Sequence, residues 1–311
     1  MAEQRTVAVL GTGTIGASWT ALFLAHGLQV RAWDPAPNGR DRLADFVEQA
    51  WPALEQLGSA PRAHRSAWSF HADPAEAVLG ASFVQENAPE RLDVKRELLG
   101  RLVGAIGADA ILASSSSGLL PSDIQAGAPF AARVVVGHPF NPPHLIPLVE
   151  VVGGRETEPA TIEAAMAFYR SVGRRPIRLN KEVPGHLVNR LQAAIWREAV
   201  DAVATGLASV EDVDAGIAYG PGLRWALMGP HMTFHLAGGG KGMPGFMEHF
   251  APSIERWWAD MRQPTLTEEL KAALIAGVEV EAAGRTPSEL AAERDRRLIL
   301  LLQALDQSSA A

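Results

Sequence analysis

A glycine-rich turn between an apolar run and a helix constrains this chain more than any other feature. Residues 11–16 read Gly-Thr-Gly-Thr-Ile-Gly, which fits the pattern G-x-G-x-x-G. The run 7–10 before the turn is typical of a buried strand, and the apolar residues after it recur with helical spacing. A second strand pattern at 28–33 completes a strand–helix–strand unit. The chain is therefore expected to begin with a βαβ unit.

Each glycine of this turn has a separate physical role in a dinucleotide-binding site. Gly11 permits the tight turn, Gly13 lets the backbone approach a pyrophosphate, and Gly16 lets helix and strand pack closely. Thr14 and Ile15 open the helix, whose N-terminal N–H groups attract phosphate. The sequence therefore predicts a Rossmann-type dinucleotide-binding domain.

A carboxylate at the end of the second strand pattern bears on the choice of cofactor. Asp34 stands 23 residues after the first glycine of the turn. A carboxylate in this place accepts hydrogen bonds from ribose hydroxyls and repels a 2′-phosphate, so NAD is the expected cofactor. The nearby Arg40 keeps NADP open as an alternative. A second alternative is that the same turn belongs to a Rossmann-like fold that binds another ligand, such as S-adenosylmethionine.

The sequence pattern divides the chain into two parts of different character. Short apolar runs alternate with helical segments up to about residue 183, which predicts a doubly wound, mainly parallel sheet of the α/β class. Beyond this point only helical periodicity continues. We therefore expect an NAD-binding domain over residues 1–183 and an all-helical domain over 184–311. The further strand patterns lie at residues 82–85, 110–113, 133–136 and 148–152.

Two helix starts in the second part carry capping patterns. Ser209 precedes a Val-Glu-Asp sequence and is typical of a helix N-cap. Thr286 is followed by proline and, three residues on, by Glu289, which is the pattern of a capping box. The helix after it presents a leucine-rich face that either completes the core or forms a subunit contact. Its leucines are Leu290, Leu298, Leu301, Leu302 and Leu305.

Composition excludes several classes of protein. The 28 Lys and Arg residues against 35 Asp and Glu give a net charge of −7, a poor match to nucleic acid or to an anionic membrane. The 311 residues contain no cysteine, which excludes disulfides, thiolate metal sites and a cysteine nucleophile. Residues 1–5 lack the layout of a secretion signal, and no apolar run is long enough to cross a bilayer. A cytoplasmic protein is expected, without nucleic-acid or membrane partners.

A histidine and a glutamate accompany two neighbouring strand patterns. His138 follows the run 133–136, and Glu150 lies 12 residues later within the run 148–152. Ligands of doubly wound sheets bind at the carboxyl ends of the strands. His138 in that place can remove the proton of an alcohol while hydride leaves its carbon, and Glu150 can orient the imidazole. The alternative is a loop histidine that satisfies backbone groups beside an ordinary paired carboxylate.

Several segments, in order along nearly the whole chain, resemble the L-3-hydroxyacyl-CoA dehydrogenase superfamily. They include the glycine turn, the serines 114–117, His-Pro-Phe-Asn-Pro at 138–142 and Pro-Gly-His-Leu-Val-Asn-Arg at 184–190. Within the superfamily the chain is most similar to the small-acid branch, which contains L-carnitine 3-dehydrogenase, L-gulonate 3-dehydrogenase and lens lambda-crystallin. This narrower similarity rests on residues 34–35, 85–91, 117–121 and 220–225.

The resemblance implies roles for individual residues. His138 is implied to be the general base during oxidation, with Glu150 as its orienting partner. Ser117 and Asn189 are implied to hydrogen-bond the reacting oxygen. A homodimer formed through the helical domain is also implied. Two charged positions match ones that contact the nicotinamide half of NAD: Glu90 and Lys95.

The substrate side of the site has candidates of its own. Arg224 offers a planar fork to a substrate carboxylate, or else forms a salt bridge. Trp225 and Phe140 form an aromatic wall suited to a quaternary ammonium group, or else pack in the core. Asn141 follows Phe140 directly and is taken as a further substrate contact.

These features predict an NAD-dependent oxidoreductase acting at C3 of a small 3-hydroxy acid, carnitine-like or a sugar acid. One alternative is an L-3-hydroxyacyl-CoA dehydrogenase, for which a basic patch at the cleft would be expected. Another is a non-catalytic NAD-binding protein like the lens relative. No metal site is expected, because His231 and His235, four residues apart, have no evident third ligand.

Overall fold

The computed structural model describes residues 5–309, which fall into two compact units. Unit 1 comprises the chain up to Arg190 together with Leu298–Gln303, and unit 2 comprises Leu191–Arg297 with the residues beyond Gln303. The domain boundary placed at residue 183 from the sequence stays a prediction. Residues 1–4, which entered the prediction about a secretion signal, lie outside the described residues.

Unit 1 is built on a single sheet with strand order β3-β2-β1-β4-β5-β6-β7-β8. Neighbouring strands run parallel, except that β6 and β7 are antiparallel. The predicted doubly wound, mainly parallel α/β sheet is confirmed. The strands are β1 (Thr6–Leu10), β2 (Gln29–Trp33), β3 (Trp68–His71), β4 (Phe83–Glu86), β5 (Ile111–Ser114), β6 (Val134–Pro139), β7 (Leu148–Gly153) and β8 (Arg175–Arg178).

Two strands, β3 and β8, were not predicted from the sequence. They lie at the two edges of the sheet, and their side chains are half-buried or exposed. An edge strand pairs on one side only, so Trp-Ser-Phe-His and Arg-Pro-Ile-Arg lack the continuous apolar run that marks a central strand. The six central strands have that run because both of their faces are covered.

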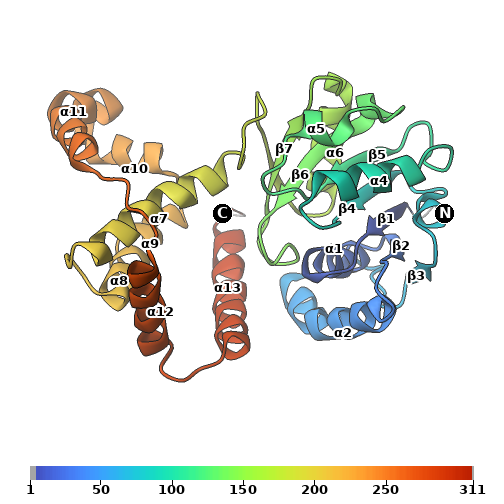
Figure 1. The fold of residues 1–311 in the computed structure, drawn as a ribbon, viewed down its shortest axis with the longest axis horizontal. Helices are drawn as coiled ribbons and strands as arrows, with labels where there is room; N and C mark the ends of the chain where they lie inside the picture. Colours follow the sequence, from blue (N-terminus) through green and yellow to red (C-terminus); the bar gives the residue numbers. More distant parts are fainter. Residues whose placement is uncertain (1–4, 310–311) are drawn as a thin grey trace. The chain divides into compact units, whose positions relative to one another are not determined.

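Helices cover both faces of the sheet, as Figure 1 shows. Alternate residues of β1 enter opposite layers: Val7 and Val9 pack in one cluster, Ala8 and Leu10 in the other. The first cluster is closed by α1 (Thr14–Ala25), α2 (Gly39–Leu57) and α6 (Pro159–Ser171). The second is closed by α3 (Pro74–Val78), α4 (Leu92–Arg101) and α5 (Pro121–Gln125), and the short 3-10 helix η1 (Ala131–Arg133) precedes β6.

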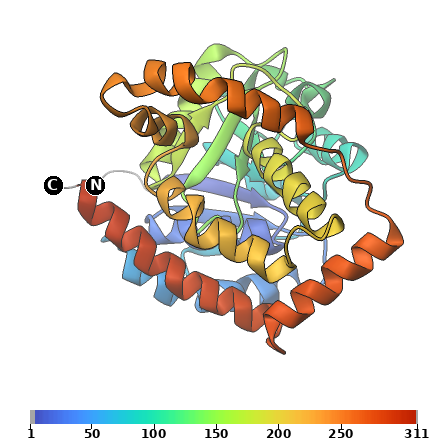
Figure 2. The ribbon, with the colours of Figure 1, turned by 90° about the vertical axis from the view of Figure 1, so that its left-hand side faces the viewer.

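From residue 188 to 309 the structure describes helices and their connections without a strand, and Figure 2 shows these helices in yellow to red. Both predicted capping patterns are present. The Ser209 hydroxyl accepts a hydrogen bond from the Asp212 amide, and Thr286 and Glu289 bond each other reciprocally. The helices are α7 (Val188–Ala204), α8 (Val210–Tyr219), α9 (Pro221–Trp225), α10 (Pro230–Ala237), η2 (Gly239–Lys241), α11 (Gly242–Asp260), α12 (Glu268–Ala282) and α13 (Pro287–Ser309).

Unit 2 buries far fewer side chains than unit 1. Val200, Thr233 and Phe246 are buried, whereas Trp257 and Trp258 are 61% and 67% exposed. Along the part of the chain that is described, no helix is long and apolar enough to cross a membrane.

Candidate active site

The glycine turn has the geometry that a bound pyrophosphate needs. Gly11 has φ +85°, and a Cβ on it would lie 2.8 Å from the Asn87 carbonyl oxygen. A Cβ on Gly16 would collide with the Gly11 carbonyl oxygen, whereas Gly13 faces open space. Gly13 is also the N-cap of α1 and provides no side-chain cap for the first amides of that helix. The backbone is therefore open to a ligand at Gly13 and closely packed at the other two glycines.

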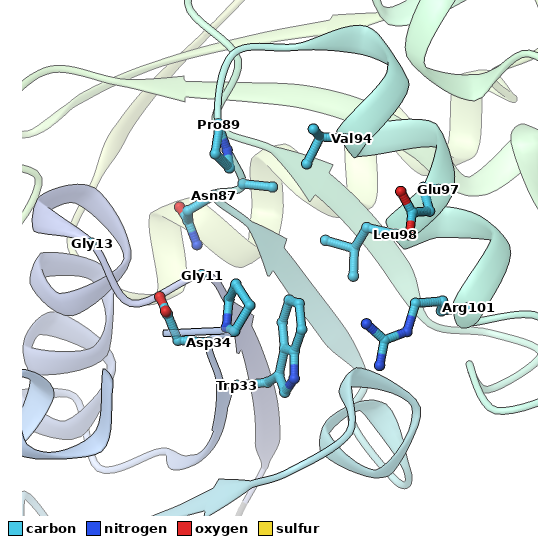
Figure 3. A pocket seen from close by; sticks show the side chains of 12 residues that line it. Gly11, Gly13, Trp33, Asp34, Asn87, Pro89, Val94, Glu97, Leu98 and Arg101 are labelled. Carbon is cyan, nitrogen blue, oxygen red and sulfur yellow. The ribbon is translucent and has the colours of Figure 1, made fainter. Parts of the chain in front are cut away.

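A cavity of about 430 Å³ lies beside this turn. Figure 3 shows Trp33, Leu98 and Arg101 around it, with Asp34 next to the glycine turn. The Arg101 guanidinium lies 5.3 Å from the centre of the Trp33 ring. The cavity thus joins an apolar and aromatic part to a carboxylate beside the turn, which suits an adenosine. Its remaining lining residues include Gly11, Gly13, Pro35, Asn87, Ala88, Pro89, Val94 and Glu97.

Asp34 is held in place by backbone amides. One carboxylate oxygen accepts the Thr12 N–H at 2.6 Å and the other accepts the Ala36 N–H at 2.8 Å. These bonds fix the carboxylate at the cavity wall while leaving lone pairs for ribose hydroxyls. Arg40, the residue that kept NADP open, is exposed and is not among the residues that line the cavity.

A second cavity, of about 500 Å³, is lined by most of the predicted catalytic residues. Asn87 and Ala88 line both cavities, so the two are neighbours within unit 1. Ile15, the predicted start of α1, also lines the second cavity. The other lining residues are Glu90, Ser115, Ser117, His138, Pro139, Phe140, Asn141 and Asn189.

His138 and Glu150 are direct partners in the only antiparallel pair of strands described in the sheet, β6 and β7. Residues opposite each other in such a pair point to the same face, so the register alone brings the two side chains together. His138 Nδ1 lies 2.8 Å from Glu150 Oε2, and both side chains are buried. With Nδ1 engaged, Nε2 is the ring nitrogen on which a proton can be exchanged.

The second oxygen of Glu150 binds the start of α7. Oε1 accepts the backbone N–H groups of Leu187 and Val188, each at 2.9 Å. Burial would raise the pKa of Glu150, but the hydrogen bond from His138 and those from the two amides outweigh it and lower this pKa. Glu150 is therefore a fixed anion beside His138.

Ser117 and Asn189 are brought together in the lining of the same cavity. Asn189 Nδ2 donates to the Ser117 carbonyl oxygen at 2.9 Å. Glu90 Oε1 accepts the backbone N–H groups of Ser117 and Gly118 at 2.9 and 2.8 Å, and the Ser116 hydroxyl at 2.7 Å. Burial opposes the charge of Glu90, yet the bonds from Ser116 and Gly118 lower its pKa. Residues 116–118, the serine loop, are thus held by hydrogen bonds to Glu90 and to Asn189.

Lys95 has a different environment from the other predicted residues. Its side chain is 1% exposed, and Nζ donates to both oxygens of Glu86, at 2.9 and 3.0 Å, and to the Ala88 carbonyl oxygen at 3.0 Å. It lies 3.9 Å from Glu90 Oε2 and is not among the residues that line either cavity. Its predicted contact with the nicotinamide half stays a prediction.

A buried polar network around Asn87 was not predicted from the sequence. The Ser115 hydroxyl donates to Asn87 Oδ1 at 2.7 Å and accepts from Gln85 Nε2 at 2.9 Å. Asn87 Nδ2 in turn donates to the Leu10 and Gln85 carbonyl oxygens. Glu86 was not singled out either, although it is fully buried and pairs with Lys95. The only available sequence signal was polar residues at the end of the apolar strand pattern 82–85.

The loop that carries Phe140 and Asn141 is anchored to α1. Ser18 Oγ lies 2.7 Å from His144 Nδ1 and accepts the His144 backbone N–H at 2.9 Å. Phe140 is half-buried, with its ring centre 4.8 Å from that of His138, and Asn141 is exposed. The predicted aromatic residue is therefore next to the predicted base.

The remaining predicted residues belong to unit 2. Arg224 and Trp225 lie on α9, the first exposed and the second half-buried. His231 and His235 lie on α10, where His235 Nδ1 accepts the Met243 backbone N–H at 3.1 Å. Within residues 5–309 no group of three or more His, Asp or Glu side chains is arranged to hold a metal ion.

Comparisons with known proteins agree along the whole chain. Residues 6–183 match the 3-hydroxyacyl-CoA dehydrogenase NAD binding domain, and residues 185–277 match the 3-hydroxyacyl-CoA dehydrogenase C-terminal domain. The chain is 51% identical to an L-carnitine dehydrogenase of Streptomyces griseus, over 97% of this chain and 90% of that protein. It is 46% identical to an L-carnitine dehydrogenase of a Pseudomonas species, over 98% and 95%.

A solved structure is similar over nearly its full length. It is a 5-formyl-3-hydroxy-2-methylpyridine 4-carboxylic acid 5-dehydrogenase, described as an NAD+-dependent dismutase, with a TM-score of 0.84 and 30% identity. The match covers 98% of this chain and 99% of that one.

Proposed function

Since this chain belongs to the 3-hydroxyacyl-CoA dehydrogenase family, we propose that His138 is the general base of its reaction. The chain is an NAD-dependent oxidoreductase that acts on the CH–OH group of 3-hydroxy acids. The observation that carries the proposal is the His138–Glu150 pair, 2.8 Å apart, whose His138 lines a cavity that adjoins the glycine turn.

The proposed step moves one hydride and one proton. His138 Nε2 takes the proton of the C3 hydroxyl, the C–O bond becomes a carbonyl, and the hydride on C3 leaves for the cofactor. When bound, NAD accepts that hydride. The fixed carboxylate of Glu150 stabilises the imidazolium that forms at His138. In the reverse direction His138 returns the proton to the oxygen.

Ser117 and Asn189 are proposed to hold the reacting oxygen. Both line the cavity with His138, and the bond between Asn189 and the Ser117 carbonyl fixes their relative position. A hydroxyl and an amide donor in this place stabilise negative charge on the substrate oxygen while the proton moves.

The residues that would hold NAD are proposed from the first cavity and the glycine turn. Gly11, Gly13 and Gly16 with the first turn of α1 would bind the pyrophosphate, and Asp34 the ribose. Trp33 and Arg101 would cover the adenine. Glu90, which lines the second cavity, is proposed to face the nicotinamide half. Lys95, whose Nζ lies 3.9 Å from Glu90 Oε2, is proposed to stabilise the charge of that carboxylate.

A carnitine-like acid is the proposed substrate. The support is the identity of about half of all residues to two proteins described as L-carnitine dehydrogenases, as quoted above. Phe140, next to His138, offers an aromatic face to a quaternary ammonium group. Asn141 in the second cavity, and Arg224 and Trp225 of α9, stay proposed contacts of the substrate.

A cytoplasmic homodimer is the proposed state of the protein. The exposed apolar side chains of unit 2, among them Trp257 and Trp258, favour coverage by a second copy.

The test replaces His138 by Asn and measures turnover and cofactor binding separately. Loss of a general base is expected to lower kcat by about 10²–10⁴-fold. NADH binding, followed by fluorescence, should be retained, because His138 does not line the cavity of the dinucleotide turn. Wild-type turnover in this variant would remove the proposal. A screen of carnitine, gulonate, 3-hydroxybutyrate and 3-hydroxybutyryl-CoA identifies the substrate, and exclusive use of the CoA thioester would contradict the small-acid proposal.

A further inference from the structure

His186 is a fully buried histidine beside the reaction site for which the proposed step has no role. Its side chain is 0% exposed, and its ring centre lies 5.4 Å from that of His138. Its backbone has φ +52°, in the left-handed region that few residues other than glycine adopt. Strain of this kind persists where the surroundings over-determine it, and it is concentrated at functional sites.

The hydrogen bonds of His186 define its protonation. Nε2 lies 3.1 Å from the Ser116 carbonyl oxygen, and a carbonyl only accepts, so Nε2 carries the proton. In the neutral ring Nδ1 is then an acceptor. Nδ1 is buried and has no hydrogen-bond partner among the described residues. A buried acceptor without a partner is unfavourable, so its presence needs a compensating role.

The titratable groups around His186 come from three segments of the chain. His138 stands on β6, Glu150 on β7, and Glu90 after β4. Burial lowers the pKa of His186, and the nearby His138 lowers it further, while the bond to Ser116 and the two carboxylates oppose this shift. Both carboxylates are already occupied, Glu150 by His138 and two amides and Glu90 by the serine loop. His186 therefore stays neutral at neutral pH.

The strained turn at Gly185 and His186 also orients the backbone amides that bind Glu150. Gly185 has φ +74° and His186 follows it in the same left-handed region. This double turn directs the next two amides, those of Leu187 and Val188, at Glu150 Oε1. One turn thus places the His186 ring beside His138 and fixes the carboxylate that orients His138.

We propose that His186 is a positioning residue of the reaction. Its neutral ring packs beside His138, and its Nε2–H holds the Ser116 carbonyl and with it the following residue, Ser117. A proton on Nδ1 would place a second positive charge beside the imidazolium that His138 forms in the proposed step. The inference rests on the proposed role of His138.

The test uses two variants of His186 and a matched control. His186→Phe keeps a ring and removes the donor, and His186→Gln keeps a donor near the position of Nε2 but cannot take a proton. The control is His26→Gln, because His26 is another histidine whose pKa burial lowers. Its Nδ1 bonds the Leu22 carbonyl, and neither residue lines the second cavity. Each protein is assayed for kcat, for KM of NAD and substrate, and for NADH binding as a check of folding.

The Phe variant should lose about 10–100-fold in kcat, the range expected when a catalytic group is misplaced. Its KM for NAD should not change, because His186 lines neither cavity. The Gln variant should recover most of the lost kcat, and its kcat should fall less steeply than that of the wild type as the pH is lowered. His26→Gln should match the wild type.

Three results would overturn the inference: wild-type kcat in the Phe variant, equal losses in the Phe and Gln variants, or identical acid profiles for the Gln variant and the wild type. The His138→Asn variant, assayed in parallel, separates the two proposals. If it is inactive while both His186 variants are fully active, only the role of His186 fails. If it is active, the role of His138 fails.

Discussion

Units 1 and 2 follow the same rule of apolar periodicity and bury their apolar residues to very different extents. In unit 1, Trp19 and Phe23 of α1 are 0% exposed, because the sheet provides a second layer for the helix. In unit 2, Trp257 and Trp258 of α11 are 61% and 67% exposed. Periodicity therefore predicts that a helix forms, whereas burial depends on a covering layer. The uncovered layer of unit 2 supports the proposed homodimer.

The largest expected difference between the units comes from alanine at a helical glycine. Gly16→Ala forces a Cβ into the Gly11 carbonyl oxygen, so we expect a loss of more than about 3 kcal/mol in stability, together with loss of NAD binding. Gly216→Ala in α8 meets no atom within 4 Å and should stabilise unit 2 by about 1 kcal/mol. Thermal unfolding and NADH titration check both. Equal behaviour of the two variants would contradict the packing described for the turn.

The second difference concerns carboxylate oxygens with and without hydrogen-bond partners. Glu150→Gln removes the charge that orients His138, and it offers an amide where Oε1 accepts two N–H groups. We expect kcat to fall by about 10²-fold. Glu198 of α7 has an oxygen that is buried and without a hydrogen-bond partner among the described residues. Glu198→Gln should therefore leave kcat unchanged, and steady-state kinetics of the two variants tests the contrast.

A third prediction tests the uncovered layer of unit 2. The double variant Trp257→Ser/Trp258→Ser should weaken self-association by about 10-fold or more, because two large aromatic side chains are lost from an interface. NADH binding should not change. Sedimentation velocity over a range of concentrations measures the association. Leu79→Ser, at a 54% exposed position of unit 1, is the control and should leave association intact. Unchanged association of the double variant would show that α11 does not form the interface between two copies of the chain.

The smallest effect is expected from pH. Burial lowers the pKa of His26, His71 and His186 from 6.5, so the unfolded chain binds more protons than the folded one below that pH. The stability that these groups contribute is therefore fully present above about pH 6.5 and is lost as the pH falls below it, because the unfolded chain takes up protons that the folded chain does not. The lowered pKa values of Glu90 and Glu150 add a second loss below 4.5.

Urea unfolding at successive pH values measures this dependence. Because all five groups lie in unit 1, a probe of that unit, such as NADH binding, should follow the loss. A stability that rises as the pH falls from 6.5 would have the wrong sign for lowered histidine pKa values.

The sequence predicted the parts of unit 1 that depend on local pattern. The glycine turn, the six central strands and the helix after the turn each follow from spacing along one segment. The same reasoning placed His138 after one strand pattern and Glu150 within the next, and the structure brings their side chains together. The cofactor was predicted from the glycine turn and Asp34, and the family and the reaction class from the resemblance; the comparisons confirm all three.

Contacts between distant segments could not be predicted in this way. The Glu86–Lys95 pair, the Asn87–Ser115 bond and the Ser18–His144 bond each join residues from different elements. None of these pairs produces a periodic pattern in the sequence, because only the folding of the chain brings the two residues together. His186 belongs to the segment 184–190 that resembles the family. Its burial and left-handed backbone could not be predicted, because they are properties of the folded chain.

The pairing of β6 with β7 also affects how this site can change in evolution. Because His138 and Glu150 are opposite in the ladder, inserting one residue into either strand would turn one of them to the other side of the sheet. The connection between the strands, from Phe140 to Pro147, has no such restriction on its length. Insertions there can reshape the substrate side while the proton-transfer pair is inherited intact. The antiparallel ladder therefore lets specificity diverge without loss of the chemistry.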